Sequence, residues 1–194
     1  MKKILATAAL MAVASAYAVD YNGAGFAVPD LGSASSSINV PDNITITDVN
    51  VTLNNMTHTW VGDVRAILTG PGGSATLVDR IGVPPGAGDS SDFGGNYTFD
   101  SQSANNIWTT AAGLGAAGVI PSGTYATTGA GSGANNNSLN AFNGQSSLGN
   151  WTLTISDHAG ADVGGIGGWT LSIVPEPTSL SLLGLAGLAL IRRR

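Results

Sequence analysis

The sequence predicts an all-β protein, an antiparallel β-sandwich, and three observations carry that prediction. Apolar residues fall in short runs that alternate with polar ones, the pattern of strands with one buried face. Turns rich in glycine separate these runs. Between the two ends of the chain, no segment shows the 3.6-residue apolar periodicity of a helix. Short strands joined by such turns favour two packed antiparallel sheets.

The first long strand is expected to begin at Ile44, after a linker or loop at 33–37 (SASSS). Its apolar residues form two alternating series that are out of step by one position: Ile44 and Ile46, then Val49, Val51 and Leu53. A β-bulge shifts the facing of side chains in this way, so we predict a bulge between 46 and 49.

A hairpin follows. Val64, Ala66 and Leu68 alternate and stop at 70–73 (GPGG), a strong turn signal, so the segment 75–81 is expected to return beside them. Three later strands are expected, at 97–99, 151–155 and 169–173.

The region between these later strands is richer in glycine and asparagine, with AAGLGAAG at 111–118 and three asparagines at 135–137. Loops of this length are uncommon in compact domains and are usually functional or mobile. We expect a flexible surface insertion over about 101–141, with a functional loop as the alternative.

The N-terminus has the three parts of a secretory signal peptide: Lys2 and Lys3, an apolar segment over 4–14, and the small-residue motif Ala16-Tyr17-Ala18. We predict cleavage after Ala18 and export of the remaining chain.

The C-terminus carries a second pattern, Pro175-Glu176-Pro177, an uncharged apolar stretch over 178–191, and Arg192, Arg193 and Arg194. An apolar run before a basic cluster is typical of a membrane stop-transfer segment. A helix over 178–191 reaches about 21 Å at 1.5 Å per residue, less than the ~30 Å hydrocarbon core. The pattern therefore predicts a short membrane helix that anchors the chain weakly and transiently.

The body between these ends is strongly acidic. Residues 19–174 hold eleven aspartates against Arg65 and Arg80, a formal charge of about −9. So few cations cannot neutralise a run of phosphates, which excludes nucleic acid as a partner. The chain has no cysteine, so an exported domain must fold without disulfides.

No catalytic site is expected. His58, His158 and many serines and aspartates allow a Ser-His-Asp triad on paper, but a triad is defined by geometry, and a composition this rich in serine always permits one. The chain has no Gly-x-Ser-x-Gly elbow.

The C-terminal pattern resembles the PEP-CTERM sorting signal of Gram-negative surface and exopolysaccharide-associated proteins. The resemblance implies an exosortase-type sorting enzyme as partner, transient association with the inner membrane, and delivery to the cell envelope, outer surface or extracellular matrix. An ordinary tail anchor or a buried C-terminal helix is the alternative.

Motifs in the body resemble the P domain, the jelly-roll β-sandwich that follows the catalytic domain in proprotein convertases and many bacterial subtilisin-like proteases. The matching segments are 57–64 (THTWVGDV), 67–73 (ILTGPGG), 142–144 (FNG), 149–157 (GNWTLTISD), and 162–173 (DVGGIGGWTLSI). Val64 in place of the usual leucine and the long 101–141 insertion depart from the family pattern. The predicted organisation is a signal peptide (1–18), an N-terminal strand and linker (19–43), a P-domain-like jelly roll (44–173) and a sorting signal (174–194).

The motif residues are interpreted first as scaffold, with Trp151 and Trp169 in the core and Asp63 accepting hydrogen bonds from turn backbone. The alternative is a calcium site, because calcium prefers hard oxygen ligands from loops and the resemblance implies bound calcium in bacterial members. The candidate ligands are Asp48, Asp63, Asp157 and Asp162.

These observations predict an exported, non-catalytic protein of the surface or exopolysaccharide matrix with a structural or interaction role, its partners being exopolysaccharide or other surface proteins. One alternative is a calcium-assisted carbohydrate-binding module with Trp60, Trp108 and Tyr125 as candidate sugar-stacking residues. The other is an accessory domain that serves a subtilisin-like protease in trans.

Overall fold

The structure is a computed structural model that describes residues 17–84, 86–129 and 131–177. The predicted signal peptide up to Ala16 and the tail from residue 178, with Arg192, Arg193 and Arg194, lie outside the described residues. Within the described ranges, no helix has the length and apolar character needed to cross a membrane.

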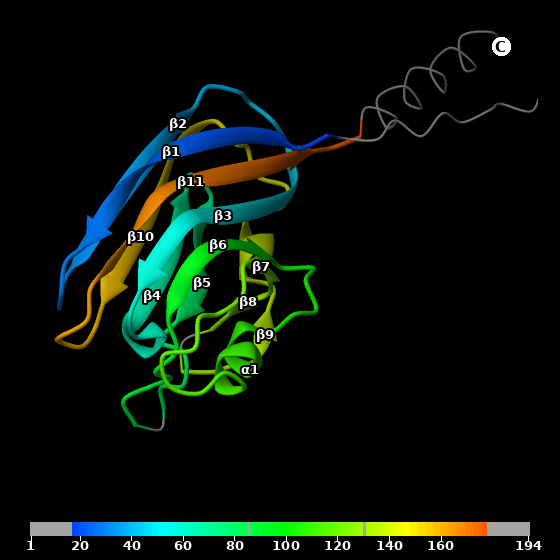
Figure 1. The fold of residues 1–194 in the computed structure, drawn as a ribbon. Helices are drawn as coiled ribbons and strands as arrows, with labels where there is room; N and C mark the ends of the chain where they lie inside the picture. Colours follow the sequence, from blue (N-terminus) through cyan, green and yellow to red (C-terminus); the bar gives the residue numbers. More distant parts are fainter. Residues whose placement is uncertain (1–16, 85, 130, 178–194) are drawn as a thin grey trace, which may run out of the picture.

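The body is a sandwich of two sheets, which confirms the all-β prediction (Figure 1). The first sheet has the order β1 (Val19–Val28), β11 (Gly164–Pro175), β3 (Ile46–His58), β6 (Phe93–Asp100) and β7 (Gly123–Tyr125). The second has the order β2 (Ser33–Val40), β10 (Gly149–Asp157), β4 (Val64–Gly70) and β5 (Gly73–Asp79). Neighbouring strands are antiparallel except β6 and β7, which are parallel.

Alternation places the apolar residues of both sheets in one core. On β10, Trp151, Leu153 and Ile155 are fully buried, and the threonines between them face outward. The two tryptophans also find the partners that their indole N–H groups need. Trp151 Nε1 donates to the Ser147 carbonyl at 2.8 Å, and Trp169 Nε1 donates to the Ser36 hydroxyl at 3.2 Å.

The bulge predicted in the first long strand is confirmed. Along β11, Val174 and Pro175 are consecutive, yet they pair with Asp48 and Ile46 of β3, so Thr47 is the extra residue. The bulge lets Ile46 and Val49 both face the core. The predicted hairpin is present as well, with Gly70 paired to Gly73 across a two-residue turn.

The sandwich begins at Val19, earlier than predicted. Residues 33–37, expected to be a linker or loop, form the first part of β2, which pairs along its whole length with β10. The backbone groups of the serines pair with β10, while Ile38 and Val40 supply the apolar contacts of this strand. The sequence did not predict a strand at 33–37 because apolar alternation begins only at Ile38. The place of this segment in the sheet depends on its pairing with β10.

Residues 101–148, between β6 and β10, form what we call the side lobe. Its elements are short: α1 (Ile107–Ala112), β7, β8 (Thr127–Thr128), β9 (Asn135–Asn136) and the 3-10 helix η2 (Ser138–Phe142). Figure 1 shows α1, β7, β8 and β9 gathered on the side of the sandwich where β5 and β6 lie.

The side lobe contributes to the core, so the expectation of a purely surface insertion is wrong. Seven of its apolar residues are buried: Ile107, Ala111, Ile120, Tyr125, Ala126, Leu139 and Phe142. The Phe142 ring lies 4.7 Å from the Trp151 ring, centroid to centroid. Because the apolar residues of the side lobe are widely spaced, no helical periodicity predicted the six-residue helix α1.

Candidate functional site

One cluster of polar side chains lies where β3 and β10 end, and its centre is a buried pair that links the two sheets. His58, the last residue of β3, places Nε2 3.2 Å from Oδ2 of Asp157, the last residue of β10, and the two side chains are 1% and 0% exposed. Burial of a carboxylate requires such a partner. The pair therefore ties the sheets together at this end of the sandwich.

Both nitrogens of His58 are engaged. The backbone N–H of Trp60 donates to Nδ1 at 3.2 Å, so the ring proton is assigned to Nε2, which donates to Asp157. The other oxygen of Asp157, Oδ1, accepts from the backbone N–H of Ala159 at 3.0 Å. A histidine held in this way has no free nitrogen for a substrate, so the geometry assigns it to structure.

Asp63, in the 3-10 helix η1 (Val61–Asp63), is buried beside this pair. Its Oδ1 finds no hydrogen-bond donor among the described residues, contrary to the expectation that it caps turn backbone. Burial raises the pKa of the Asp63 carboxyl most, the charges of Asp157 and Asp162 raise it further, and His58 and Arg80 partly oppose them. The folded protein therefore disfavours the ionised form of the Asp63 carboxyl.

The four aspartates proposed as calcium ligands do not form one site. Asp48 lies ten residues before His58 on β3, about 33 Å away at 3.3 Å per residue, and its two oxygens accept from Asn50 and Gln102. Asp162 lies at the same end as Asp63 and Asp157 but accepts from the Thr59 hydroxyl at 2.7 Å.

Across the described ranges, no group of three or more histidine, cysteine or acidic side chains is placed to hold a metal ion. The four aspartates thus do not gather at one place, because the sequence alone does not fix which strand ends meet.

Serine and histidine meet at the surface of the same end. The Ser156 hydroxyl lies 2.8 Å from Nε2 of His158, and burial together with Arg65 and Arg80 lowers the pKa of that histidine. None of the described hydrogen bonds joins the His158 ring to a carboxylate, so the orienting member of a triad is missing from this contact.

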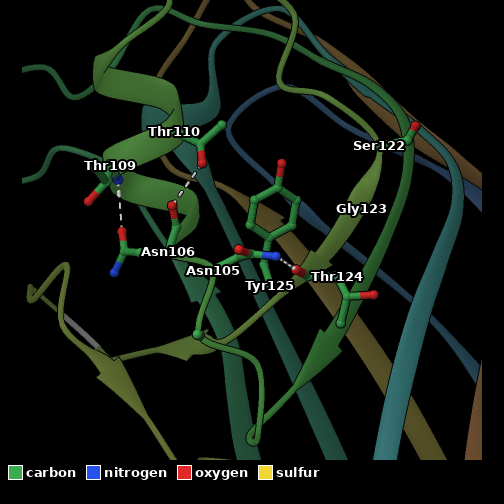
Figure 2. Close-up of a pocket in the computed structure, with 9 residues that line it drawn as sticks. Asn105, Asn106, Thr109, Thr110, Ser122, Gly123, Thr124 and Tyr125 are labelled. Carbon is green, nitrogen blue, oxygen red and sulfur yellow. Dashed lines mark hydrogen bonds between the residues drawn. The ribbon is translucent and has the colours of Figure 1, made fainter.

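A hollow of about 560 Å³ lies between α1 and β7, in the side lobe (Figure 2). Its lining consists of residues 104–106, 109–110 and 122–125, which carry hydroxyl and amide groups and no charge. Figure 2 shows the Tyr125 ring between the helix and the strand.

Hydrogen bonds hold the walls of the hollow in place. Asn106 caps α1: its Oδ1 accepts from the Thr109 N–H at 2.8 Å, and its Nδ2 donates to the Gly133 carbonyl at 2.6 Å. Nδ2 of Asn105 donates to the Thr124 carbonyl at 2.9 Å. Sequence reasoning passed over these residues, although an asparagine before IWTTAA is a recognisable N-cap signal.

The structure does not form the predicted aromatic stacking surface. Tyr125 is 5% exposed, and its hydroxyl donates to the Pro121 carbonyl. Trp108 is half-buried, packs against the core and lies outside the lining of the hollow, and its Nε1 is buried without a partner among the described residues. Trp60 lies beside His58, at the end of the sandwich with the buried pair. It is half-buried and donates through Nε1 to the Ala87 carbonyl.

The described part of the predicted sorting signal is joined to the sandwich. Pro175 ends β11 opposite Ile46, and the Glu176 N–H donates to the Thr45 carbonyl at 3.2 Å. Pro177 is the last residue described. At the other end, Ala18 directly precedes β1.

The family model of the proprotein convertase P-domain matches residues 115–173, which run from the side lobe through β10 and β11. This confirms the P-domain resemblance for the second half of the body; the motifs at 57–73 lie outside the match. No curated protein matches the chain.

Two solved structures of one protease are similar to the chain. The serine protease of Aeromonas sobria has 13% identity and a TM-score of 0.45 over 82% of this chain and 27% of its own. The same protease in complex with its chaperone ORF2 has 13% identity and a TM-score of 0.43 over 81% of this chain and 27% of its own. The chain thus spans about a quarter of the length of that protease.

Proposed function

We propose that the protein is an exported, non-catalytic interaction module, a P-domain-like sandwich that an exosortase-type system sorts to the cell surface or exopolysaccharide matrix of a Gram-negative bacterium. The observation that carries the proposal is the placement of the two ends. Val19 pairs with Ile173, so the start of β1 and the end of β11 leave the sandwich together. Figure 1 lets the reader follow both strands to this shared end.

This placement suits display from a surface. β11 has twelve residues, about 40 Å at 3.3 Å per residue, so a chain held by its tail presents the opposite end outward. That outer end carries the turns at 29–32 and 158–163, where Leu31 and Val163 are 68% and 61% exposed. Exposed apolar side chains at a loop tip suit contact with a partner.

A non-catalytic role is supported by the use of the motif residues. His58 and Asp157 satisfy each other between the sheets, and Trp151 and Trp169 fill the core. These side chains stabilise the fold, and among the described hydrogen bonds the Ser156–His158 contact has no carboxylate to orient the histidine.

The test follows the chain through export in a Gram-negative host with and without an exosortase. We expect mass spectrometry to find a new N-terminus at Val19, and loss of the tail and surface accessibility to depend on the exosortase. A variant with Arg192, Arg193 and Arg194 replaced by glutamine should remain unprocessed, while replacement of the half-buried body residue Arg65 by glutamine should leave processing intact. Export without any dependence on exosortase or tail would contradict the sorting proposal, and peptidase activity lost on His58→Ala would contradict the non-catalytic one.

A second function, accessory to a subtilisin-like protease in trans, is supported by the P-domain match at residues 115–173. Adding the purified protein to such a protease from the same cell would then raise the Tm of the protease. An unchanged Tm at a tenfold molar excess would exclude this function for that protease.

A further inference from the structure

We propose that the hollow between α1 and β7 binds a neutral sugar unit, such as a hexose of an uncharged polysaccharide, mainly through hydrogen bonds. The proposal goes beyond surface display, which needs no ligand at this place. It also differs from stacking on Trp60, Trp108 and Tyr125, because those rings do not form one exposed face.

The chemistry of the lining selects the class of ligand. The volume of about 560 Å³ lies within the range of about 300–1,000 Å³ typical of small-molecule sites. No lining residue is charged, and a desolvated ionic ligand would need a charged partner. The acidic body, with eleven aspartates against two arginines, also repels anions such as uronates and phosphates. An uncharged, polyhydroxylated ligand fits this lining.

The polar groups of the lining are held in position and keep hydrogen-bonding capacity. Asn105 is fixed through Nδ2, which leaves its Oδ1 without a donor among the described residues. Ser122 accepts the Asn96 N–H at 2.9 Å through its hydroxyl oxygen, so its own proton can be donated. Fixed groups lose little entropy when a ligand binds, which favours recognition.

Gly123 keeps the space beside Tyr125 open. A Cβ at this position would lie 3.6 Å from the Tyr125 ring, an ordinary van der Waals contact, and its three nearest atoms would all belong to Tyr125. Glycine at position 123 therefore leaves room beside this largely buried ring, and a large side chain there would reduce the volume of the hollow.

A peptide strand is a poorer occupant. β7 is the edge strand of its sheet, where a peptide would add by pairing with backbone groups. The Thr124 carbonyl already accepts from Nδ2 of Asn105 and, at 3.1 Å, from the hydroxyl of Ser103. These side chains cover the edge and favour a ligand that hydrogen-bonds to side chains instead.

Saturation-transfer NMR tests whether the purified, exported protein binds sugars. Cellohexaose and maltohexaose are the neutral probes, and hexagalacturonate is the acidic one. We expect transfer from at least one neutral probe with a Kd on the order of 1 mM, since the site has few contacts, and none from hexagalacturonate. Gly123→Leu, which fills the space beside Tyr125, should weaken binding at least tenfold. Gly113→Leu is the matched control, because Gly113 ends α1 outside the lining and a Cβ there makes ordinary contacts.

Thr124→Val provides a second variant that removes one hydroxyl from the lining while suiting a strand, with Thr154→Val on β10 as its control. Three outcomes would overturn the proposal: no transfer from either neutral probe at 10 mM, stronger binding of hexagalacturonate, or full binding by folded Gly123→Leu and Thr124→Val. Each of these outcomes leaves surface display standing, because export and processing are measured separately.

Discussion

In the sandwich, hydrogen bonds run between long strands and apolar side chains fill the space between the sheets; in the side lobe, polar side chains supply much of the bonding. β3 and β11 are paired from His58 to Ile46, and β10 is paired on both sides. In the side lobe, by contrast, the strands β8 and β9 are two residues each.

Asparagine, serine and threonine side chains connect the side lobe to itself and to β5. Asn106 reaches the Gly133 carbonyl, Asn135 the Ala104 carbonyl, and the Thr127 hydroxyl the Asn136 carbonyl. The Ser138 hydroxyl donates to the Thr76 carbonyl of β5 at 2.7 Å. A segment poor in apolar residues can thus be ordered by side-chain hydrogen bonds to the backbone, provided that a few apolar side chains enter the core.

The largest effect is expected where the two regions share a core residue. Trp151 is fully buried, contacts the Phe142 ring of the side lobe and covers Gly70 of β4. Trp151→Ala should lower the free energy of unfolding by about 4 kcal/mol, because it leaves a cavity between both regions. Urea unfolding measures this, with the half-buried Trp60→Ala as a milder control. A loss below about 1 kcal/mol would show that the lobe does not depend on this contact.

The next effect concerns the polar link between the sheets. His58→Leu leaves the Asp157 carboxylate buried without its partner and should cost about 3 kcal/mol of unfolding free energy. Replacing both His58 and Asp157 by leucine also removes the unpaired buried carboxylate, so the double variant should be more stable than His58→Leu alone. Guanidinium unfolding at pH 7 compares them, and equal stability of the two variants would refute a charge-based role.

A local effect is expected in the side lobe. Asn106→Ala removes the cap of α1 and the bond to Gly133, and should cost about 1–2 kcal/mol. Hydrogen exchange should accelerate over 101–142 while β10 and β11 stay protected, because side-chain bonds hold the lobe. Asn39→Ala, whose exposed side chain pairs with Asn150, is the control and should change little. Uniform acceleration across the sandwich would mean that the two regions open together.

The smallest effect is a pH dependence at Asp63. Because burial raises its pKa in the folded protein, the folded state keeps a proton that the unfolded state has already lost. This carboxyl therefore weakens the fold as pH rises from the unfolded value of 3.8 through the folded pKa. Asp63→Asn removes the ionised form, so its Tm should exceed the wild-type value by a few degrees, about 2–4 °C, at pH 7, and the gap should narrow toward pH 4. Thermal unfolding from pH 4 to 7 checks it; a gap independent of pH would refute the charge effect.

Elements with local periodicity were predictable. The bulge in β3 follows from the step between Ile46 and Val49, and the β4–β5 hairpin from alternation before GPGG. β2 and α1 were not predicted, since the serines of β2 carry no apolar signal and α1 is too short for a helical period.

The candidate site was predictable only in part, for a related reason. Asp63, Asp157 and Asp162 do lie at one end of the sandwich, whereas Asp48 lies at the far end of the same strand as His58. Tyr125 was recognised as a candidate, but its burial and its neighbours Asn105 and Gly123 depend on how the side lobe folds back onto β6.

The sequence by itself determined the fold class, the bulged strand, the hairpin and the uncharged character of the side lobe, because alternation, turn chemistry and composition are properties of neighbouring residues. The tertiary structure alone decided the order of the strands, the buried link from His58 to Asp157, the unpaired oxygen of Asp63 and the hollow beside Tyr125. These features join residues far apart in the sequence, Val19 with Ile173 and His58 with Asp157, and such contacts depend on which strands pair and how the connecting loops close.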